Sequence, residues 1–218
     1  MVNKRQTTKP SKNNQKSKGL DIQRWYPWIL ATAAFIGFFA SFTLTVEKFA
    51  ILKNPNHRLS CSINPLLSCG PIITSPEASA FGFPNPIIGL FAFSVLFSVA
   101  MAMFGGAVVD AGKRWYWRLY IVGHLFGVGF IAWLMSEAFY DLKALCIYCM
   151  IAWAMTIILN WYGFLWMTST GRLKIGPKLT KFRDWGLRNH WGFVLLCYLA
   201  VFGLIFFAFR AYFESVWF

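Results

Sequence analysis

The sequence predicts an all-α protein that crosses a membrane several times, and two observations carry this prediction. Of the 218 residues, 57% are hydrophobic and only 13% are charged, which is too apolar for a surface that faces water. Five stretches also lack Asp, Glu, Lys and Arg over the length that spans a hydrocarbon core, which takes about 20 helical residues. A soluble protein with five buried helices is disfavoured because apolar stretches this long are typical of membrane spans.

The chain begins with a basic tail, residues 1–25, whose Lys and Arg lie among Asn, Gln, Ser and Thr. This tail has too few apolar residues to fold by burial, so we expect it to be disordered. The apolar stretch that follows, 26–46, is too long for the core of a signal peptide and has no small-residue cleavage site near its end. It is therefore predicted to be a retained first spanning helix.

Four more spanning helices are expected after a long connection at residues 47–84. The second apolar stretch, 78–109, exceeds one crossing, and Pro84 and Pro86 indicate that its helix begins near them. The other three stretches are 119–136, 144–171 and 189–209, with a basic connection at 169–188 before the last. Trp, Tyr or charged residues flank each stretch, as expected for anchors at a membrane interface.

Lys and Arg are distributed unevenly along the chain, which predicts its orientation. The tail, the connection between the second and third helices and that between the fourth and fifth hold 16 of the 21 basic residues. Such residues concentrate on the cytoplasmic side of a cell (inner or plasma) membrane, so the N-terminus is predicted to be cytoplasmic and the C-terminus outside. The net charge of +13 then reflects topology and contact with anionic lipid. Nucleic acid is not an expected partner, because no folded binding module accompanies the charge.

Four of the five cysteines fall in segments that the charge pattern places on the outer face. Cys61 and Cys69 lie in the 47–84 connection, and Cys146 and Cys149 form a Cys-x-x-Cys where the fourth helix begins. Disulfides persist outside the cytosol, so this location suits disulfide chemistry. Cys197 lies in the middle of the fifth helix without a nearby partner and is expected to be a small packing residue.

The Cys-x-x-Cys spacing indicates a reactive pair. At a helix N-terminus the first sulfur lies beside unpaired backbone amides and the positive end of the helix dipole, which favours the thiolate of Cys146, and Lys143 should act in the same direction. Cys149 and Trp153 continue the same helix face deeper into the membrane, so an aromatic slot could hold a quinone head group beside a reactive sulfur. The loop pair, with seven residues between its cysteines, could reach outward to a soluble protein.

Three other interpretations of the cysteines are open. A zinc site would be unusual at Cys-x7-Cys spacing, and no metal is expected. Two structural disulfides are a stronger alternative, although a Cys-x-x-Cys ring within a helix is strained, and strained exposed disulfides are typically labile or catalytic. A channel or transporter with incidental cysteines is disfavoured, because His124 is the main ionisable side chain within the spans and transport pathways usually need more.

Three motifs together resemble bacterial members of the vitamin K epoxide reductase family. They are residues 61–69 (CSINPLLSC), residues 81–86 (FGFPNP) with Gly89, and residues 146–149 (CIYC). Each motif is weak alone, but their order, intervals and outward placement are specific. The similarity covers about residues 26–168 and implies a four-helix catalytic bundle around a quinone site, with one peripheral fifth helix at 189–218. It also implies a membrane oxidoreductase that forms disulfides.

The resemblance implies roles for individual residues. The thiolate of a reduced thioredoxin-fold partner would attack the Cys61–Cys69 disulfide at Cys61, and Cys69 would then attack Cys146 in its disulfide with Cys149. Cys149 would pass the electrons to a quinone of the menaquinone or ubiquinone type. The residues expected to serve this quinone are Asn85, Phe81, Phe83, Trp153 and Ser75. Asn85 could instead cap the second helix, and Ser75 could instead cap a turn before Pro76.

Two departures from the family pattern refine the prediction. Vertebrate members have a Tyr four residues after the second cysteine of Cys-x-x-Cys, where this chain has Trp153, so a second quinone hydrogen bond of that kind is not expected. Many bacterial members carry a fused thioredoxin-like domain, and none is expected after Phe209, so the partner is predicted to be a separate protein. The alternatives are a vitamin K epoxide or quinone reductase, and a non-catalytic membrane scaffold with structural disulfides.

Overall fold

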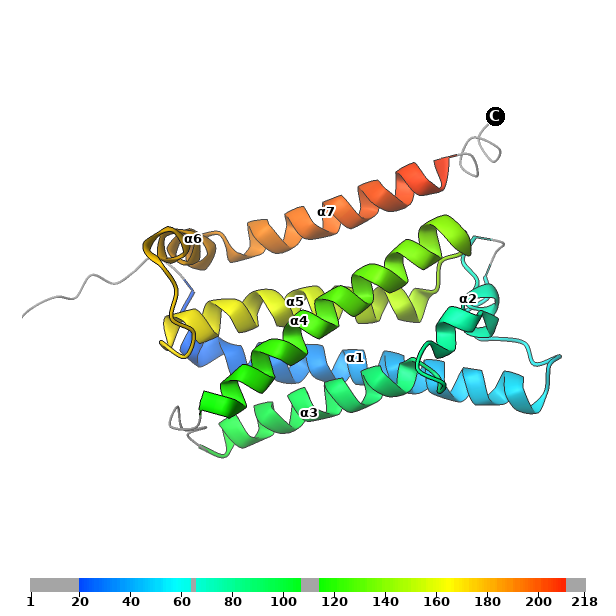
Figure 1. Ribbon diagram of the computed structural model, residues 1–218, viewed down its shortest axis with the longest axis horizontal. Helices are drawn as coiled ribbons and strands as arrows, with labels where there is room; N and C mark the ends of the chain where they lie inside the picture. Colours follow the sequence, from blue (N-terminus) through cyan, green and yellow to red (C-terminus); the bar gives the residue numbers. More distant parts are fainter. Residues whose placement is uncertain (1–19, 64–65, 107–113, 211–218) are drawn as a thin grey trace, which may run out of the picture.

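The computed structural model describes residues 20–63, 66–106 and 114–210, and over these residues the chain is helical (Figure 1). Most of the predicted disordered tail and the end of the predicted outer C-terminus lie outside the described residues. The elements are α1 (Ile22–Lys53), α2 (Gly70–Thr74), the 3-10 turn η1 (Pro76–Ser79), α3 (Pro86–Phe104), α4 (Arg114–Ser136), the π-turn η2 (Glu137–Asp141), α5 (Ile147–Ser169), α6 (Pro177–Arg188) and α7 (His190–Ala208).

Five of these helices are long and apolar enough to cross a membrane, which confirms the predicted all-α, multi-pass class. They are α1, α3, α4 with its η2 extension, α5 and α7. The second spanning helix begins at Pro86, as the two prolines indicated, and the fourth begins directly after Cys146. The predicted spans therefore correspond one to one with the observed helices.

α1 is longer at both ends than its predicted span of 26–46. It has 32 residues, whereas about 20 suffice to cross the hydrocarbon core. At its start it takes in Arg24, whose long stem can keep its charge at the interface while the helix continues. At its end it extends to Lys53 and carries Glu47 on its buried side. The extension turns part of the predicted connection at 47–84 into an ordered platform for the cysteine loop.

α1 lies at the centre of the bundle and packs against both α3 and α5 (Figure 1). The approach to α3 is very close, because a side-chain carbon added at Gly37 would overlap the ring of Phe93, and one added at Gly89 would overlap Ser41. On the α5 side, the ring of Tyr26 stacks on Trp166 with their centroids 4.8 Å apart. Glycine is thus required where α1 and α3 meet.

The glycines of α4 do not form the possible close-packing surface that their presence in the sequence offered. A side-chain carbon at Gly123 or Gly129 would meet nothing within 4 Å, and one at Gly127 would make an ordinary 3.9 Å contact with Thr156 of α5. α4 crosses α5 obliquely, and its outer face is exposed (Figure 1). That exposed apolar face is the side expected to meet lipid.

The predicted loop at 169–188 contains a helix that the sequence analysis missed. α6 begins with Pro177 in its first turn and packs Gly186 against the ring of Trp161. Before it, the Arg172 guanidinium lies 4.3 Å from the ring centroid of Trp166 and 4.7 Å from that of Trp117. Cation–π contacts of this kind hold a basic connection against the bundle. We call this end of the bundle, marked by α6, the basic end.

α7 is the outermost helix in Figure 1, as expected of the fifth helix, but it is not isolated. Its last turn packs Ile205 and Phe209 into a cluster with Phe139 of η2 and Trp153 of α5. The rings of Phe139 and Phe209 have their centroids 6.4 Å apart, and Phe139 meets Trp153 edge to face at 5.9 Å. α7 therefore supports the far end of the bundle, where the cysteines lie.

We expect Gly37→Ala to lower the stability of the protein by about 1–3 kcal/mol, because the added methyl group overpacks the contact with Phe93. Gly129→Ala is the matched control, since it lies in a helix interior with open space around it, and it should be neutral or slightly stabilising. Thermal unfolding in detergent measures both. Equal melting temperatures for the two variants would contradict the close approach of α1 and α3.

Candidate redox site

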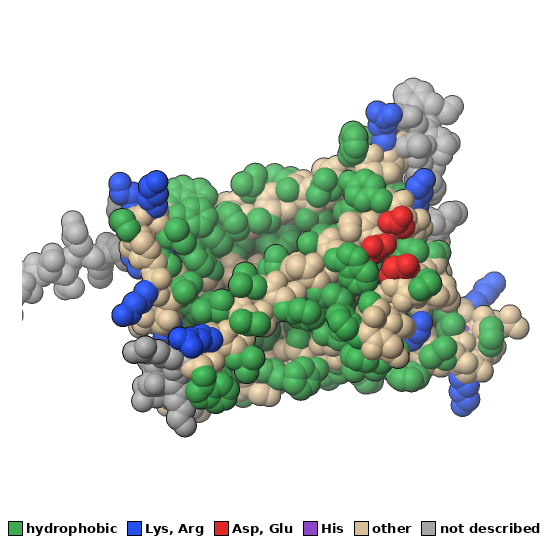
Figure 2. Space-filling model, viewed as in Figure 1, with side chains coloured by type: hydrophobic (Ala, Val, Ile, Leu, Met, Phe, Trp, Pro, Cys, Tyr) green, Lys and Arg blue, Asp and Glu red, His purple; other side chains and the backbone are tan. Residues whose placement is uncertain are grey.

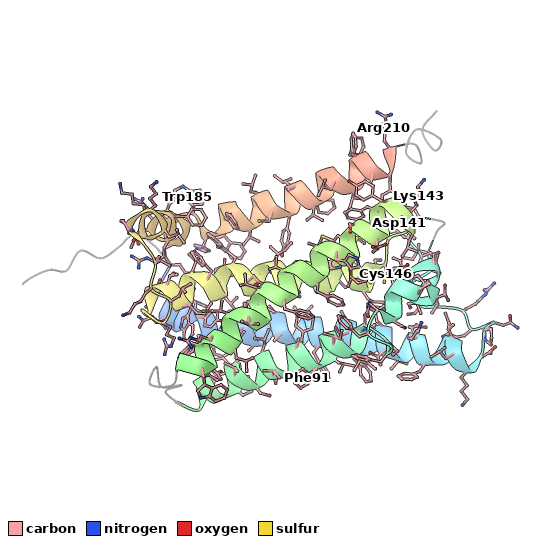
Figure 3. The ribbon with its side chains drawn as sticks, in the orientation of Figure 1. Phe91, Asp141, Lys143, Cys146, Trp185 and Arg210 are labelled. Carbon is pink, nitrogen blue, oxygen red and sulfur yellow. A yellow bond between two sulfur atoms is a disulfide. The ribbon has the colours of Figure 1, made fainter. Side chains whose placement is uncertain are left out.

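Three sulfur atoms meet at the end of the bundle opposite α6, which we call the cysteine end. Cys61 and Cys69 form a disulfide, and the Sγ of Cys146 lies 2.7 Å from the Sγ of Cys69. All three sulfurs lie within 4.8 Å of one another, and each of the three residues is at most 2% exposed. Figure 3 labels Cys146 where the chain enters α5, next to α2. The loop pair and the helix pair predicted from sequence thus meet at one surface.

A backbone bridge sets this register between loop and helix. Leu67 pairs with Leu145 as an isolated parallel bridge, in which the Leu145 amide donates to the Leu66 carbonyl at 2.9 Å. Two residues beyond Leu67 comes Cys69, and one residue beyond Leu145 comes Cys146. Leu66 and Leu145 are both buried, so the bridge lies in an apolar setting where its hydrogen bond is strong.

The segment that leads into Cys146 is shaped by an irregular connection. The π-turn η2 ends α4, and the Leu142 amide donates to the Glu137 carbonyl at 2.9 Å. Lys143 then adopts φ of 46°, the left-handed region that side-chain-bearing residues seldom occupy. The Ala144 amide donates back to the Ala138 carbonyl at 3.2 Å. Together these bonds turn the chain so that Leu145 can reach the loop.

Cys146 is the N-cap residue of α5, as the Cys-x-x-Cys pattern predicted. Its sulfur accepts a hydrogen bond from the Cys149 amide at 3.5 Å. A hydrogen bond from the Cys149 side chain, with further support from the amides of Cys149 and Tyr148, lowers the pKa of the Cys146 thiol, although burial alone would raise it. Lys143 is exposed and does not contribute to the shift, because water solvates its charge. The helix start therefore favours a Cys146 thiolate.

Cys149 borders a small cavity of about 40 Å³ between α5, η1 and the end of α4. Its walls are formed by Ile72, Ser75, Glu77, Ala78, Leu134, Glu137, Ala138, Leu142, Cys149 and Trp153. The slot predicted beside Cys149 and Trp153 is therefore present, but it is narrow. Sites for small organic ligands typically have volumes of about 300–1,000 Å³. A quinone ring would need the walls to move apart.

Two of the residues expected to serve a quinone line this cavity. Trp153 is 4% exposed and is held from behind by Phe139. Ser75 lines the cavity and also caps η1, since its hydroxyl oxygen accepts a hydrogen bond from the Ala78 amide at 3.2 Å. Both interpretations of Ser75 are thus compatible with its position.

Asn85, Phe81 and Phe83 lie outside the cavity walls. The Asn85 amide donates to the Glu77 carbonyl at 2.6 Å, and its oxygen accepts from the Ala80 amide at 3.2 Å. Asn85 makes no side-chain cap to α3, so the alternative capping role is wrong, and its bonds tie η1 to the start of α3. Phe81 and Phe83 are 54% and 43% exposed, with Phe81 packing near Phe130.

Glu47 is a site-supporting residue that sequence reasoning missed. It is 7% exposed, and its carboxylate accepts hydrogen bonds from the Ser60 amide at 3.1 Å and the Ser60 hydroxyl at 2.5 Å. The imidazole of His57 lies 3.0 Å from its second oxygen. These bonds tether the segment directly before Cys61 to the end of α1. An acidic residue just beyond an apolar stretch gives no signal of this role, because its partners are ten and more residues away.

The three buried sulfurs could share a metal only if all three were thiolates, since the thiolate is the form that binds metals. In this structure Cys61 and Cys69 are bonded to each other, so two of the three have no such charge. The arrangement is that of a thiol facing a disulfide, which is the geometry for exchange. Cys197 lies half-buried on α7, and it is not part of this cluster.

The helices and the site define a multi-pass membrane protein with a thiol placed against a disulfide. The profile described as "Vitamin K epoxide reductase family" matches residues 28–164, more than half of the chain. The chain belongs to that family, which implies a membrane thiol–disulfide oxidoreductase. Comparison with curated protein sequences finds no match.

The pKa of Cys146 should depend on its neighbour in the helix. Cys149→Ala removes the largest cause of the lowered pKa of Cys146, so this pKa should rise. The pH at which alkylation of Cys146 becomes fast should therefore be higher than in the parent protein. Cys149→Ser retains a hydroxyl donor and should keep more of the shift. Peptide mass spectrometry of protein labelled with iodoacetamide over a pH series measures both. Identical profiles for the Ala and Ser variants would contradict the side-chain hydrogen bond.

Glu47→Ala should release the segment before Cys61. Without the carboxylate, the Ser60 amide loses its partner, so hydrogen exchange over residues 57–62 and reduction of Cys61–Cys69 by dithiothreitol should both become faster. Lys53→Ala, an exposed change on the same helix, is the control. If both variants are reduced at the rate of the parent protein, Glu47 does not hold the loop.

Proposed function

We propose that this protein reoxidises a separate thioredoxin-fold protein and transfers the electrons to a quinone, which supports disulfide formation in exported proteins. The observation that carries the proposal is the position of the Cys69 sulfur, bonded to Cys61 and 2.7 Å from Cys146. A static structural disulfide would have no need of a buried free thiol in contact with it. The family membership supports the same class of chemistry.

The relay begins when a thiolate of the reduced partner attacks Cys61, after which the partner leaves as a disulfide and the loop pair is reduced. Cys69 then attacks Cys146 in its bond to Cys149, and Cys61 attacks Cys69 to reform the loop disulfide. This leaves Cys146 and Cys149 reduced, which is the bonding pattern of the structure. The lowered pKa of Cys146 suits it to leave as a thiolate in the second exchange.

The first step requires the loop to open. Cys61 is 2% exposed, so a partner sulfur cannot reach it in the closed arrangement. The neighbouring segment is more accessible: residues 53–58 are exposed, and Glu47 is the main tether of the segment that follows them. Docking of the partner on this segment would displace it and expose Cys61.

A quinone would accept two electrons from the reduced Cys146–Cys149 pair. Cys149 and Trp153 line a small cavity beside the pair, and its wall, mostly apolar with Ser75, Glu77 and Glu137 as polar side chains, suits a quinone ring. Ser75 offers a hydroxyl group there. Because the cavity is narrow, we infer that the ring enters when η1 and the end of α4 move apart. Asn85 could contribute to such a widened site, since its amide is bonded to the backbone of η1.

The proposal includes an orientation, with the cysteine end outside the cell membrane and the basic end in the cytoplasm. The support is the concentration of Lys and Arg in the tail and in the connections at the basic end. Four of these residues, Lys178, Lys181, Arg183 and Arg188, lie on α6. In that orientation the disulfide faces the compartment in which disulfides persist.

Purified full-length protein, mixed with a reduced thioredoxin-fold oxidase and a short-chain quinone, should reduce the quinone as followed by its absorbance. Cys149→Ala should abolish this activity, because Cys146 then has no partner with which to form the disulfide that Cys69 attacks. Cys197→Ala is the matched control and should remain active. Full activity in Cys149→Ala would show that the cysteines are structural, and reduction of the quinone without any partner requirement would favour a quinone reductase.

A further inference from the structure

Quinone reduction needs protons as well as electrons. A quinone that takes up two electrons becomes a stable quinol only when each of its two oxygens also receives a proton. The Cys146–Cys149 pair supplies the electrons, but Cys146 is completely buried, so its thiol is poorly placed to take up protons from water. A group that can exchange protons with water and also reach the cavity is therefore required.

The cavity beside Cys149 has two carboxyl groups in its wall. Among the described residues, Glu77, Glu137 and Cys149 are the titratable groups that line it. Glu77 belongs to η1 and Glu137 to η2, so the two carboxyl groups come from the two elements that close the cavity. Each is half-buried, and thus in contact with both the cavity and the surroundings.

Acidic side chains gather at this part of the cysteine end in Figure 2, and Figure 3 labels Asp141 at the end of the adjacent turn. The carboxyl groups of Asp141 and Glu77 are close enough to that of Glu137 to interact with it electrostatically. The Trp133 side chain, one turn earlier in α4, donates a hydrogen bond to Glu137. Lys143 is exposed two residues beyond Asp141.

We propose that Glu137 and Glu77 are the proton donors for the quinone at this cavity, an inference that rests on the proposed function. A carboxyl group positioned within reach of a reacting oxygen is a common general acid, and it regains its proton from water. Both carboxyl groups and the Cys149 sulfur line the same cavity, so a quinone bound there could receive protons from the carboxyl groups and electrons from the sulfur.

The step balances without another reagent. Cys146 and Cys149 form a sulfur–sulfur bond and lose two electrons and two thiol protons. The quinone gains two electrons from the sulfurs and one proton at each oxygen from the carboxyl groups. The carboxylates are then protonated from the outer water, into which the thiol protons are released, so the net reaction converts one dithiol and one quinone into one disulfide and one quinol.

The test measures the two halves of the catalytic cycle separately. Full-length protein whose helix pair has been reduced by dithiothreitol is mixed with a short-chain quinone in a stopped-flow instrument, and the quinone absorbance gives the rate of the second half. Reduction of oxidised protein by dithiothreitol, quenched with a thiol label, gives the rate of the first half. The variants are Glu137→Gln, Glu77→Gln and the double variant. Asp184→Asn is the matched control, since it removes an exposed carboxylate on α6, at the opposite end of the bundle from the cavity.

The double variant should slow the quinone half-reaction by about 100-fold or more, which is the size of general acid catalysis. The deficit should shrink as the pH is lowered, because hydronium ions can then replace the carboxyl groups. The thiol half-reaction of the Glu variants and both half-reactions of Asp184→Asn should keep the rates of the parent protein. An unchanged quinone half-reaction, an equal deficit in both halves, or a deficit that does not vary with pH would overturn the proton-donor role.

Cys149→Ala, measured in parallel, separates this proposal from the one on which it rests. If the parent protein reduces the quinone no faster than Cys149→Ala does, the proposed function itself fails. If the parent protein is active and Cys149→Ala is not, the function stands, and the Glu variants alone decide the source of the protons.

Discussion

The site depends on one short contact between two backbones, the bridge of Leu66 and Leu67 with Leu145. Sulfurs that exchange disulfides must come into direct contact with each other. A loop of about thirty residues between two spanning helices would otherwise have many conformations, most of which would keep the sulfurs apart. The bridge fixes the register of Cys69 against Cys146. Side-chain contacts then hold it in place: Leu66 and Leu145 belong to the cluster that includes Phe139, Trp153 and the end of α7.

The elements around the bridge are irregular for a reason. A regular α4 would continue past Ser136 and carry the chain away from the loop. The π-turn and the left-handed Lys143 bend it back over a few residues, so that α5 can begin at the same level as α2. Irregular backbone at a functional site is common, because the surrounding packing can hold conformations that isolated segments avoid. Here the cost of the bend is offset by burial of Ala138 and Phe139.

The sequence predicted the five spans, the meeting of the two cysteine pairs and the capping position of Cys146, because apolar length and Cys-x-x-Cys spacing are local signals. Contacts made at long range were not predictable. Glu47 could not be linked to Ser60, nor Gly37 to Phe93, without knowing how α1 and its neighbours align. α6 was missed because it is short and polar and carries no span signal. For the motif residue Asn85 the sequence left a quinone contact and a helix cap open, but in the structure its amide is bonded to the turn before the helix.

The complete burial of Cys69 and Cys146 has a consequence for how such a protein behaves among other thiols. Under the proposed function, small thiols would reduce this buried junction slowly, whereas a protein that opens the loop would reach it faster. The quinone would thereby be protected from most of the soluble thiols in the outer compartment. Burial would thus slow each catalytic cycle, but it would also restrict the electrons to those delivered by the specific protein partner.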